Sequence, residues 1–114
     1  MNPEVKAEWI ACLTDGSYKQ GKYQLRDLDD RFDPIGVLMD RAVAAGVIPA
    51  PKCYGEGRVN PVFFGWEYDR SATRITKAVE EWSGLPYWTA NRILTLNDSG
   101  NSFAEIADFI KENC

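Results

Sequence analysis

The sequence predicts an α+β fold in which about five short helices pack on a small antiparallel sheet or ribbon, as a single domain over residues 1–114. Hydrophobic residues make up 45% of the 114 residues and aromatic residues 12%, which is typical of a globular chain. Apolar residues recur at helical spacing towards both ends of the chain. The middle instead carries prolines, glycines and alternating aromatic residues, which indicate strands and turns.

The front half is expected to begin with a helix and to continue with a short strand. Asn2 followed by Pro3 predicts the helix start, because the Asn side chain can cap the first turn and proline lacks an N–H that would need a partner there. Tyr23 and Leu25 alternate with polar residues, so a half-buried strand is predicted over residues 22–26.

A second front-half helix is predicted from Asp33-Pro34, where Asp33 can act as the cap. Gly46 is expected to end this helix with a positive φ. Gly36 lies inside its first turns and weakens it by up to about 1 kcal/mol relative to alanine. We interpret Gly36 as a point where the backbone of another element comes close.

The middle of the chain is expected to form strands. Phe64, Trp66 and Tyr68 alternate with Gly65 and Glu67, which favours a strand. In addition, the sequence Gly-Glu-Gly at 55–57 predicts a hairpin that joins strands at 53–54 and 58–59.

The back half is expected to hold three helices. Ser71 or Thr73 is predicted to cap the first, which Gly84 closes, and Pro86 is predicted to start the second. The last begins with a capping box and has an apolar face; these residues are Ser102 and Glu105 for the box, and Phe103, Ile106, Ala107 and Ile110 for the face.

Composition excludes several classes of function. The net charge of −4 is opposite to that of a typical duplex-binding domain, so nucleic acid is disfavoured as a partner. The chain has no histidine, which removes the commonest general base and mixed Cys/His zinc sites. Its three cysteines have no CxxC spacing, and no cofactor-binding or catalytic motif is present. We therefore expect no cofactor, no metal and no assigned catalytic residue.

A cluster of carboxylates at Asp27, Asp29, Asp30 and Asp33 suggests calcium at first, but position 5 of an EF-hand loop would be Arg31 and position 6 Phe32. A solvated acidic turn followed by a helix cap explains the cluster better. Without a signal peptide or an apolar run long enough to span a membrane, a cytosolic location is expected.

The aromatic middle segment is the first candidate for a ligand surface. Flat aromatic faces stack on purine-like rings, and arginines pair with phosphate or carboxylate. The candidate residues there are Tyr54, Arg58, Trp66, Tyr68 and Arg70. The alternative interpretation is that the alternate aromatic side chains are buried in the core.

Two polar turns supply further candidates. Tyr18 and Gln20 could bind the edge of a ligand, although a tight connection through Gly21 explains them as well. Asn97 and Asp98 resemble a polar catalytic turn, but Asn and Asp also serve at helix ends by bonding the backbone.

The segment from Leu94 to Ile110 has the pattern of the first part of a helix-turn-helix. No recognition helix follows it, and as a recognition helix the last one would present carboxylates to phosphate; its expected exposed residues are Glu105, Asp108, Lys111 and Glu112. A DNA-binding regulator is therefore the weakest of the functional alternatives.

Several short sequence patterns occur in a fixed order. They include Gly-Ser-Tyr-Lys-Gln-Gly at 16–21, Phe-x-Pro-Ile-Gly-Val-Leu-x-Asp at 32–40, Trp-x-Gly-Leu at 82–85 and Leu-Asn-Asp-x-Gly-x-Ser-Phe at 96–103. Across residues 9–40 and 82–110 the chain resembles a family of small uncharacterised proteins of tailed phages and prophages. Family members often carry cysteines near the positions of Asp33 and Met39, so any role of those cysteines does not transfer.

The resemblance implies an accessory protein that acts in the cytoplasm of an infected bacterium. Together with the missing catalytic motifs, it favours a non-catalytic binder in counter-defence or host takeover, whose target is a host protein or a small nucleotide-like ligand. The alternatives are a histidine-free hydrolase that acts on a nucleotide and, least favoured, a DNA-binding regulator. Self-association is a further expectation, because four tryptophans in a small domain can leave an apolar patch exposed.

Overall fold

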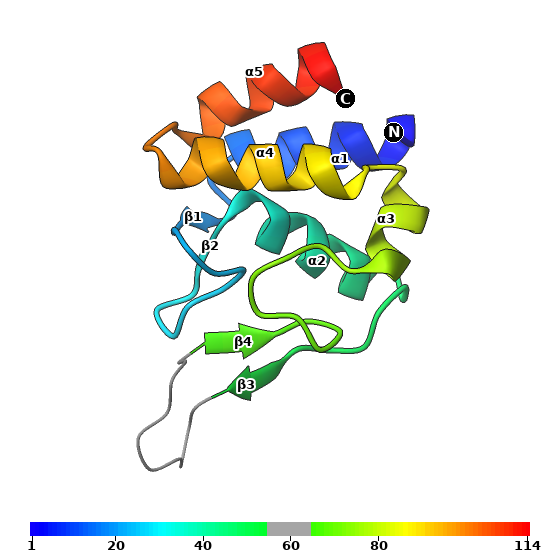
Figure 1. Ribbon diagram of the computed structural model, residues 1–114, viewed down its shortest axis with the longest axis vertical. Coiled ribbons are helices and arrows are strands. Elements are labelled where there is room, and N and C mark those ends of the chain that lie inside the picture. Colours follow the sequence, from blue (N-terminus) through cyan, green and yellow to red (C-terminus); the bar gives the residue numbers. More distant parts are fainter. Residues whose placement is uncertain (55–64) are drawn as a thin grey trace.

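The computed structural model describes residues 1–54 and 65–114, apart from the side chain of Tyr54. These residues form one compact α+β unit, as predicted (Figure 1). Its elements in chain order are α1 (Pro3–Thr14), β1 (Lys19–Gln20), β2 (Arg31–Phe32), α2 (Pro34–Ala44), β3 (Lys52–Tyr54), β4 (Gly65–Glu67), α3 (Lys77–Ser83), α4 (Tyr87–Asp98) and α5 (Phe103–Asn113).

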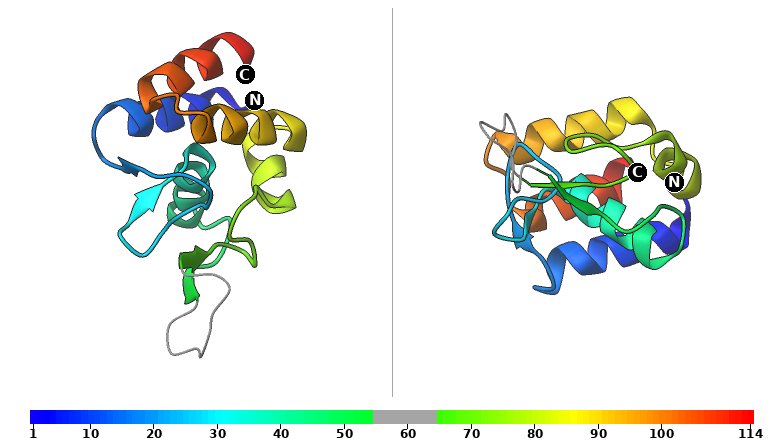
Figure 2. Two further views of the ribbon diagram at one scale, coloured as in Figure 1. Left: turned by 60° about the vertical axis from the view of Figure 1, so that its left-hand side comes forward. Right: turned by 90° about the horizontal axis from the view of Figure 1, so that it is seen from below.

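The helices α1, α4 and α5 form a layer at one end of the molecule, and α2 lies beneath them (Figure 1). Trp9 of α1 is fully buried, and its indole N–H donates a 2.8 Å hydrogen bond to the Pro34 carbonyl at the start of α2. The β3–β4 hairpin lies at the opposite end, and the two chain ends lie beside each other (Figure 2). None of the helices described is long and apolar enough to cross a membrane.

The predicted helix caps are confirmed where the signal is local. The Asn2 side chain accepts hydrogen bonds from backbone N–H groups in the first turn of α1. The Asp33 side chain accepts a 2.7 Å hydrogen bond from the Gly36 N–H. Ser102 and Glu105 form the reciprocal capping box of α5. Local capping chemistry therefore sets three of the helix starts.

Gly36 is the point of close approach that the sequence indicated. A β-carbon at this position would lie 1.8 Å from the carbonyl oxygen of Leu25, closer than any real contact. Gly46 has a φ of 76°, as expected for the residue that ends α2. The close approach fixes the segment before β2 against the start of α2.

The strand predicted over residues 22–26 is wrong. Tyr23 has a φ of 70°, which a strand does not allow, and its side chain is 71% exposed. Its backbone N–H donates to Oδ1 of Asp98 at 3.1 Å instead of to a neighbouring strand. Strand β1 precedes Tyr23 and strand β2 follows it, and these two strands pair in parallel. The described sheets are therefore not all antiparallel.

The predicted strand around Trp66 is confirmed as β4, and it pairs with β3. Cys53 of β3 pairs with Trp66 of β4 in an antiparallel register. On the other side of β4, the Trp66 N–H donates to the Arg26 carbonyl at 3.1 Å. The predicted turn at 55–57, the strand expected at 58–59, and Phe64 lie outside the described residues.

The start predicted for α3 is also wrong. Neither Ser71 nor Thr73 caps this helix, which begins at Lys77 with Thr76 as an N-cap that makes no side-chain bond. The Ser71 hydroxyl instead closes a turn: it donates to the Arg74 carbonyl at 2.7 Å and accepts the Arg74 N–H at 3.0 Å. This turn shapes one wall of the pocket described below. The predicted ending at Gly84 is confirmed by its φ of 73°.

Candidate functional site

Two of the predicted site residues, Tyr18 and Tyr68, meet on the carboxylate of Asp40. The Tyr18 hydroxyl donates to Oδ2 at 2.5 Å and the Tyr68 hydroxyl donates to Oδ1 at 2.9 Å. Burial and the adjacent Asp40 raise the pKa of both phenols above the usual value. We call these three residues the Asp40 cluster, and its phenols stay protonated at neutral pH.

Two arginines contact the tyrosine hydroxyls of the Asp40 cluster. Arg41 donates through Nε to the Tyr18 hydroxyl at 3.0 Å, and Arg26 approaches the Tyr68 hydroxyl at 3.5 Å. The Arg26 guanidinium also lies 4.1 Å from the centre of the Trp66 ring, which is a cation–π distance. Trp66 is thus half-buried against Arg26, and the structure commits these aromatic groups to internal contacts.

Gln20 and Asn97, two further predicted residues, bond to each other. The Gln20 amide donates to Oδ1 of Asn97 at 2.7 Å and to the Asn101 carbonyl at 2.8 Å, and its oxygen accepts the Phe103 N–H at 3.1 Å. The Asn97 amide donates to the Gly21 carbonyl at 2.8 Å. This pair ties β1 to the turn between α4 and α5.

The remaining predicted residues are distributed over other places. Arg70 is exposed and lines a separate hollow of about 380 Å³, together with Pro49, Ala50, Lys52, Glu67 and Asp69. Arg58 and the side chain of Tyr54 lie outside the described part of the structure. Asp98 lines a different pocket, which is the best candidate for a ligand site.

This pocket, here called the α4 pocket, has a volume of about 360 Å³, within the usual range for small-ligand sites. It lies along α4, opposite the loop that carries Tyr23 and the turn that precedes α3. Its lining is mostly polar: Tyr23, Asp33, Thr73, Arg74, Asn91, Leu94, Thr95 and Asp98.

One end of the α4 pocket is acidic. Asp33 is only 1% exposed, and Asp98 lies at the C-terminal end of α4. Burial raises the pKa of Asp33 well above its usual range; the hydrogen bond from the Gly36 N–H opposes this shift, and the negative charge of Asp98 adds to it. No described residue donates a hydrogen bond to Oδ2 of Asp98, so that oxygen is free to bind a ligand.

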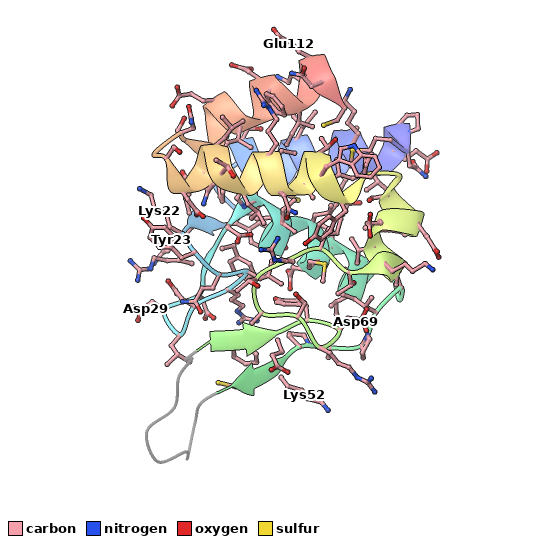
Figure 3. All side chains as sticks on the ribbon, in the orientation of Figure 1. Lys22, Tyr23, Asp29, Lys52, Asp69 and Glu112 are labelled. Atoms are coloured by element: carbon pink, nitrogen blue, oxygen red, sulfur yellow. The ribbon has the colours of Figure 1, made fainter. Side chains whose placement is uncertain are left out.

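Tyr23 forms the rim at this acidic end. Its hydrogen bond to Asp98 holds the backbone in the left-handed region, which costs roughly 1–2 kcal/mol for a residue with a β-carbon. Figure 3 shows Tyr23 beside the end of α4 that carries Asp98. The protein therefore holds an exposed aromatic ring at the pocket mouth at a conformational cost, a pattern associated with functional sites.

The other end of the α4 pocket is basic. Arg74 donates through Nη1 to the Tyr87 hydroxyl at 2.9 Å, and its guanidinium lies 5.9 Å from the centre of the Tyr87 ring. Hydrogen bonding by Asn91, together with Arg74, lowers the pKa of Tyr87. The turn closed by Ser71 holds the backbone of Arg74, and Tyr87 holds its guanidinium. The Arg74 side chain is therefore positioned by contacts at both of its ends.

Of the residues that line the α4 pocket, the sequence interpretation named only Asp98 as a binding residue. The missed signal is a polar stripe on α4, in which Tyr87, Asn91, Thr95 and Asp98 are spaced by three or four residues. Such spacing places them on one helix face. The contribution of Tyr23, Thr73 and Arg74 depends on contacts between distant segments and has no local signal.

Comparison with known proteins places the chain in a family. The model of a domain of unknown function, DUF8296, matches residues 1–89. The chain belongs to this family. No curated protein and no solved structure matches the chain, so membership in DUF8296 brings no activity or ligand with it. The match includes all of the pocket residues up to Arg74 and ends within α4; the phage association stays a prediction.

Proposed function

We propose that the protein is a non-catalytic binding protein that holds a small nucleotide-like ligand in the α4 pocket. The observation that carries the proposal is a polar pocket with unused hydrogen-bonding capacity beneath an exposed aromatic ring. A nucleotide offers a flat base for the Tyr23 ring and several hydrogen-bond donors for the carboxylates. Its context, by the sequence resemblance alone, is an accessory role in the cytoplasm of a phage-infected bacterium, in counter-defence or host takeover.

A small ligand is favoured over a host protein because the polar groups of the α4 pocket line a hollow, whereas both carboxylate oxygens of the Asp40 cluster already accept hydrogen bonds from tyrosines. A pocket of this size admits one small molecule and only a narrow part of a protein. A host protein stays the competing target, and it would bind elsewhere on the surface.

The test is calorimetric titration with nucleosides and nucleotides, supported by thermal-shift measurements. Thr95→Trp, which places a large side chain in the α4 pocket, should abolish binding, whereas Ala104→Trp, on the exposed face of α5, should leave it unchanged. If no nucleoside or nucleotide binds, or if Thr95→Trp binds as well as the unmodified protein, the proposal is wrong. Capture of a host protein that persists in Thr95→Trp would then support the competing target.

A second candidate function, hydrolysis of a nucleotide, is favoured by the pair of carboxyl groups at the acidic end. A buried carboxyl with a raised pKa beside a second, less buried carboxyl is the arrangement of an acid and a base. In this candidate Asp33 would protonate the leaving group, while Asp98 accepts a proton from the attacking water. Chromatography of the ligand after incubation separates the two functions: turnover that stops in Asp98→Asn supports hydrolysis, and recovery of intact ligand supports binding alone.

A further inference from the structure

The α4 pocket has two ends of opposite chemistry on a single helix face. Asp98, with Asp33 behind it and Tyr23 at the rim, forms the end at the C-terminus of α4. Arg74, held on Tyr87, forms the end near the N-terminus. A ligand that fills the pocket therefore meets hydrogen-bond acceptors at one end and a cation at the other.

The two ends are too far apart to neutralise each other. Asn91, which lies with Arg74 and Tyr87, precedes Asp98 by about two helical turns, on the order of 10 Å along the axis. Within residues 1–54 and 65–114, Arg74 makes no ion pair with Asp33 or Asp98. Opposite charges that line one pocket and remain unpaired are suited to a ligand with opposite polarity at its own ends.

We infer that the ligand is a nucleoside monophosphate whose base carries an exocyclic amine, with the base at the Tyr23–Asp98 end and the phosphate at Arg74. This inference rests on the proposed function and specifies the class and the orientation of its ligand. The amine donates to the free Oδ2 of Asp98, and the base packs on the exposed ring of Tyr23. The phosphate accepts hydrogen bonds from the planar guanidinium of Arg74.

Charge sets both the orientation and the number of phosphates. In the reverse orientation the phosphate would face the carboxylate of Asp98, which repels it. A diphosphate adds negative charge that the pocket meets with a single arginine among its lining residues. A monophosphate is therefore preferred to a diphosphate, and an amino base to a base with a carbonyl at the same position.

Four probes separate these features by titration calorimetry: AMP, IMP, adenosine and ADP. AMP and IMP differ in the amine that faces Asp98, and AMP and adenosine differ in the phosphate that faces Arg74. We expect AMP to bind at least about tenfold more tightly than IMP or adenosine, because a hydrogen bond to a charged group contributes about 1.5–3 kcal/mol and 1.4 kcal/mol is tenfold. ADP should bind more weakly than AMP.

Two variants assign each preference to a residue. Arg74→Gln should lower the affinity for AMP to that for adenosine and leave adenosine binding unchanged. Asp98→Asn should remove the preference for AMP over IMP, while Asn can still accept the Tyr23 N–H. Matched controls with the same charge change on exposed residues outside the pocket, Lys77→Gln and Asp108→Asn, should retain both preferences.

The outcomes distinguish this inference from the proposed function. If IMP, adenosine or ADP binds as tightly as AMP, or if either control variant changes the preferences as the pocket variants do, the inference is overturned while nucleotide binding stands. If none of the four probes binds to a protein whose circular dichroism shows it folded, the inference is overturned, and the proposed function is overturned as well if the remaining nucleosides and nucleotides also fail to bind.

Discussion

Two aspartates on neighbouring helices, Asp40 of α2 and Asp98 of α4, show opposite ways of using a carboxylate. Asp40 has both oxygens bonded, by the hydroxyls of Tyr18 and Tyr68. Asp98 lines the α4 pocket; its Oδ1 accepts the Tyr23 N–H, and no described residue donates a hydrogen bond to its Oδ2. Each aspartate lies beside a tyrosine, but Tyr68 is fully buried whereas Tyr23 is 71% exposed.

This difference shows how to separate a structural polar cluster from a binding site. A cluster whose donors and acceptors are satisfied internally stabilises the fold and offers little to a ligand. A pocket that leaves an acceptor free, and holds an exposed ring in a costly conformation, keeps capacity for a partner. The comparison predicts that mutations in the Asp40 cluster change stability, and that those in the α4 pocket change binding.

The largest effect is expected where the comparison is most direct, in the two tyrosines. Tyr68→Ala should lower the free energy of unfolding by about 3–5 kcal/mol, because it removes a buried aromatic ring and a partner of Asp40. Tyr23→Ala should change it by less than about 0.5 kcal/mol. Urea unfolding of both variants measures the two values. Equal losses would contradict the distinction between a closed cluster and an open pocket.

A smaller effect is expected when only the phenolic hydroxyl is removed. Tyr68→Phe should cost about 1–3 kcal/mol, since Oδ1 of Asp40 loses a donor in a partly buried site. Tyr23→Phe should be neutral to stability, because the bond to Asp98 comes from the Tyr23 backbone. Thermal unfolding followed by circular dichroism tests the pair, and a loss in Tyr23→Phe as large as that in Tyr68→Phe would argue against it.

Next in size is a gain in stability at the pocket rim. Tyr23→Gly should stabilise the protein by up to about 1 kcal/mol relative to Tyr23→Ala, because glycine adopts the positive φ without the cost of a β-carbon. Both variants lack the ring and should bind AMP equally weakly. Chemical unfolding and calorimetry check the two statements, and a Gly variant less stable than the Ala variant would disprove the strain.

The smallest change in structure, Asp33→Asn, tests the buried carboxyl at the base of the α4 pocket. Because burial raises the pKa of Asp33, the folded state holds its proton more tightly than the unfolded state. The stability that the protonated Asp33 contributes is complete below the ordinary carboxyl pKa of about 3.9 and is lost as pH rises towards the raised pKa of the folded state. Asparagine caps the helix equally well and does not titrate, so the stability of the variant relative to the unmodified protein should increase with pH.

A control of opposite sign is available at Asp15, whose pKa is lowered by hydrogen bonds from Ser17. The stability that ionised Asp15 contributes is present above the ordinary carboxyl pKa and is lost as pH falls through the lowered pKa of the folded state. Asp15→Asn should therefore lose relative stability as pH rises. Unfolding curves between pH 3 and pH 8 decide both cases, and parallel trends in the two variants would contradict the assignment to Asp33.

The parts of the fold that the sequence predicts are those governed by neighbouring residues. The caps at Asn2, Asp33 and Ser102 depend on residues within one helical turn, and each is confirmed. Gly36 is a partial exception. A glycine in the first turns of a helix indicates that another backbone comes close, but only the structure identifies Leu25 as the neighbour.

The parts that could not be predicted depend on contacts between distant segments. The alternation at Tyr23 and Leu25 has the period of a strand, yet the hydrogen bond from Tyr23 to Asp98 and the approach of Leu25 to Gly36 impose another backbone path. The same holds for the site. The residue types of Tyr18 and Tyr68 are visible in the sequence, but the position of Asp40 between them is a property of the fold alone.

The packing of α5 on α1 has a practical consequence for work on DUF8296. The family match ends at residue 89, inside α4, whereas α5 covers α1 and places Phe103, Ile106 and Ile110 in the core. A gene fragment cut at the family boundary would encode only the first three of the twelve residues of α4 and would leave an apolar side of α1 bare. Such a fragment should be recovered from inclusion bodies, so expression plasmids for this protein need to extend through residue 114.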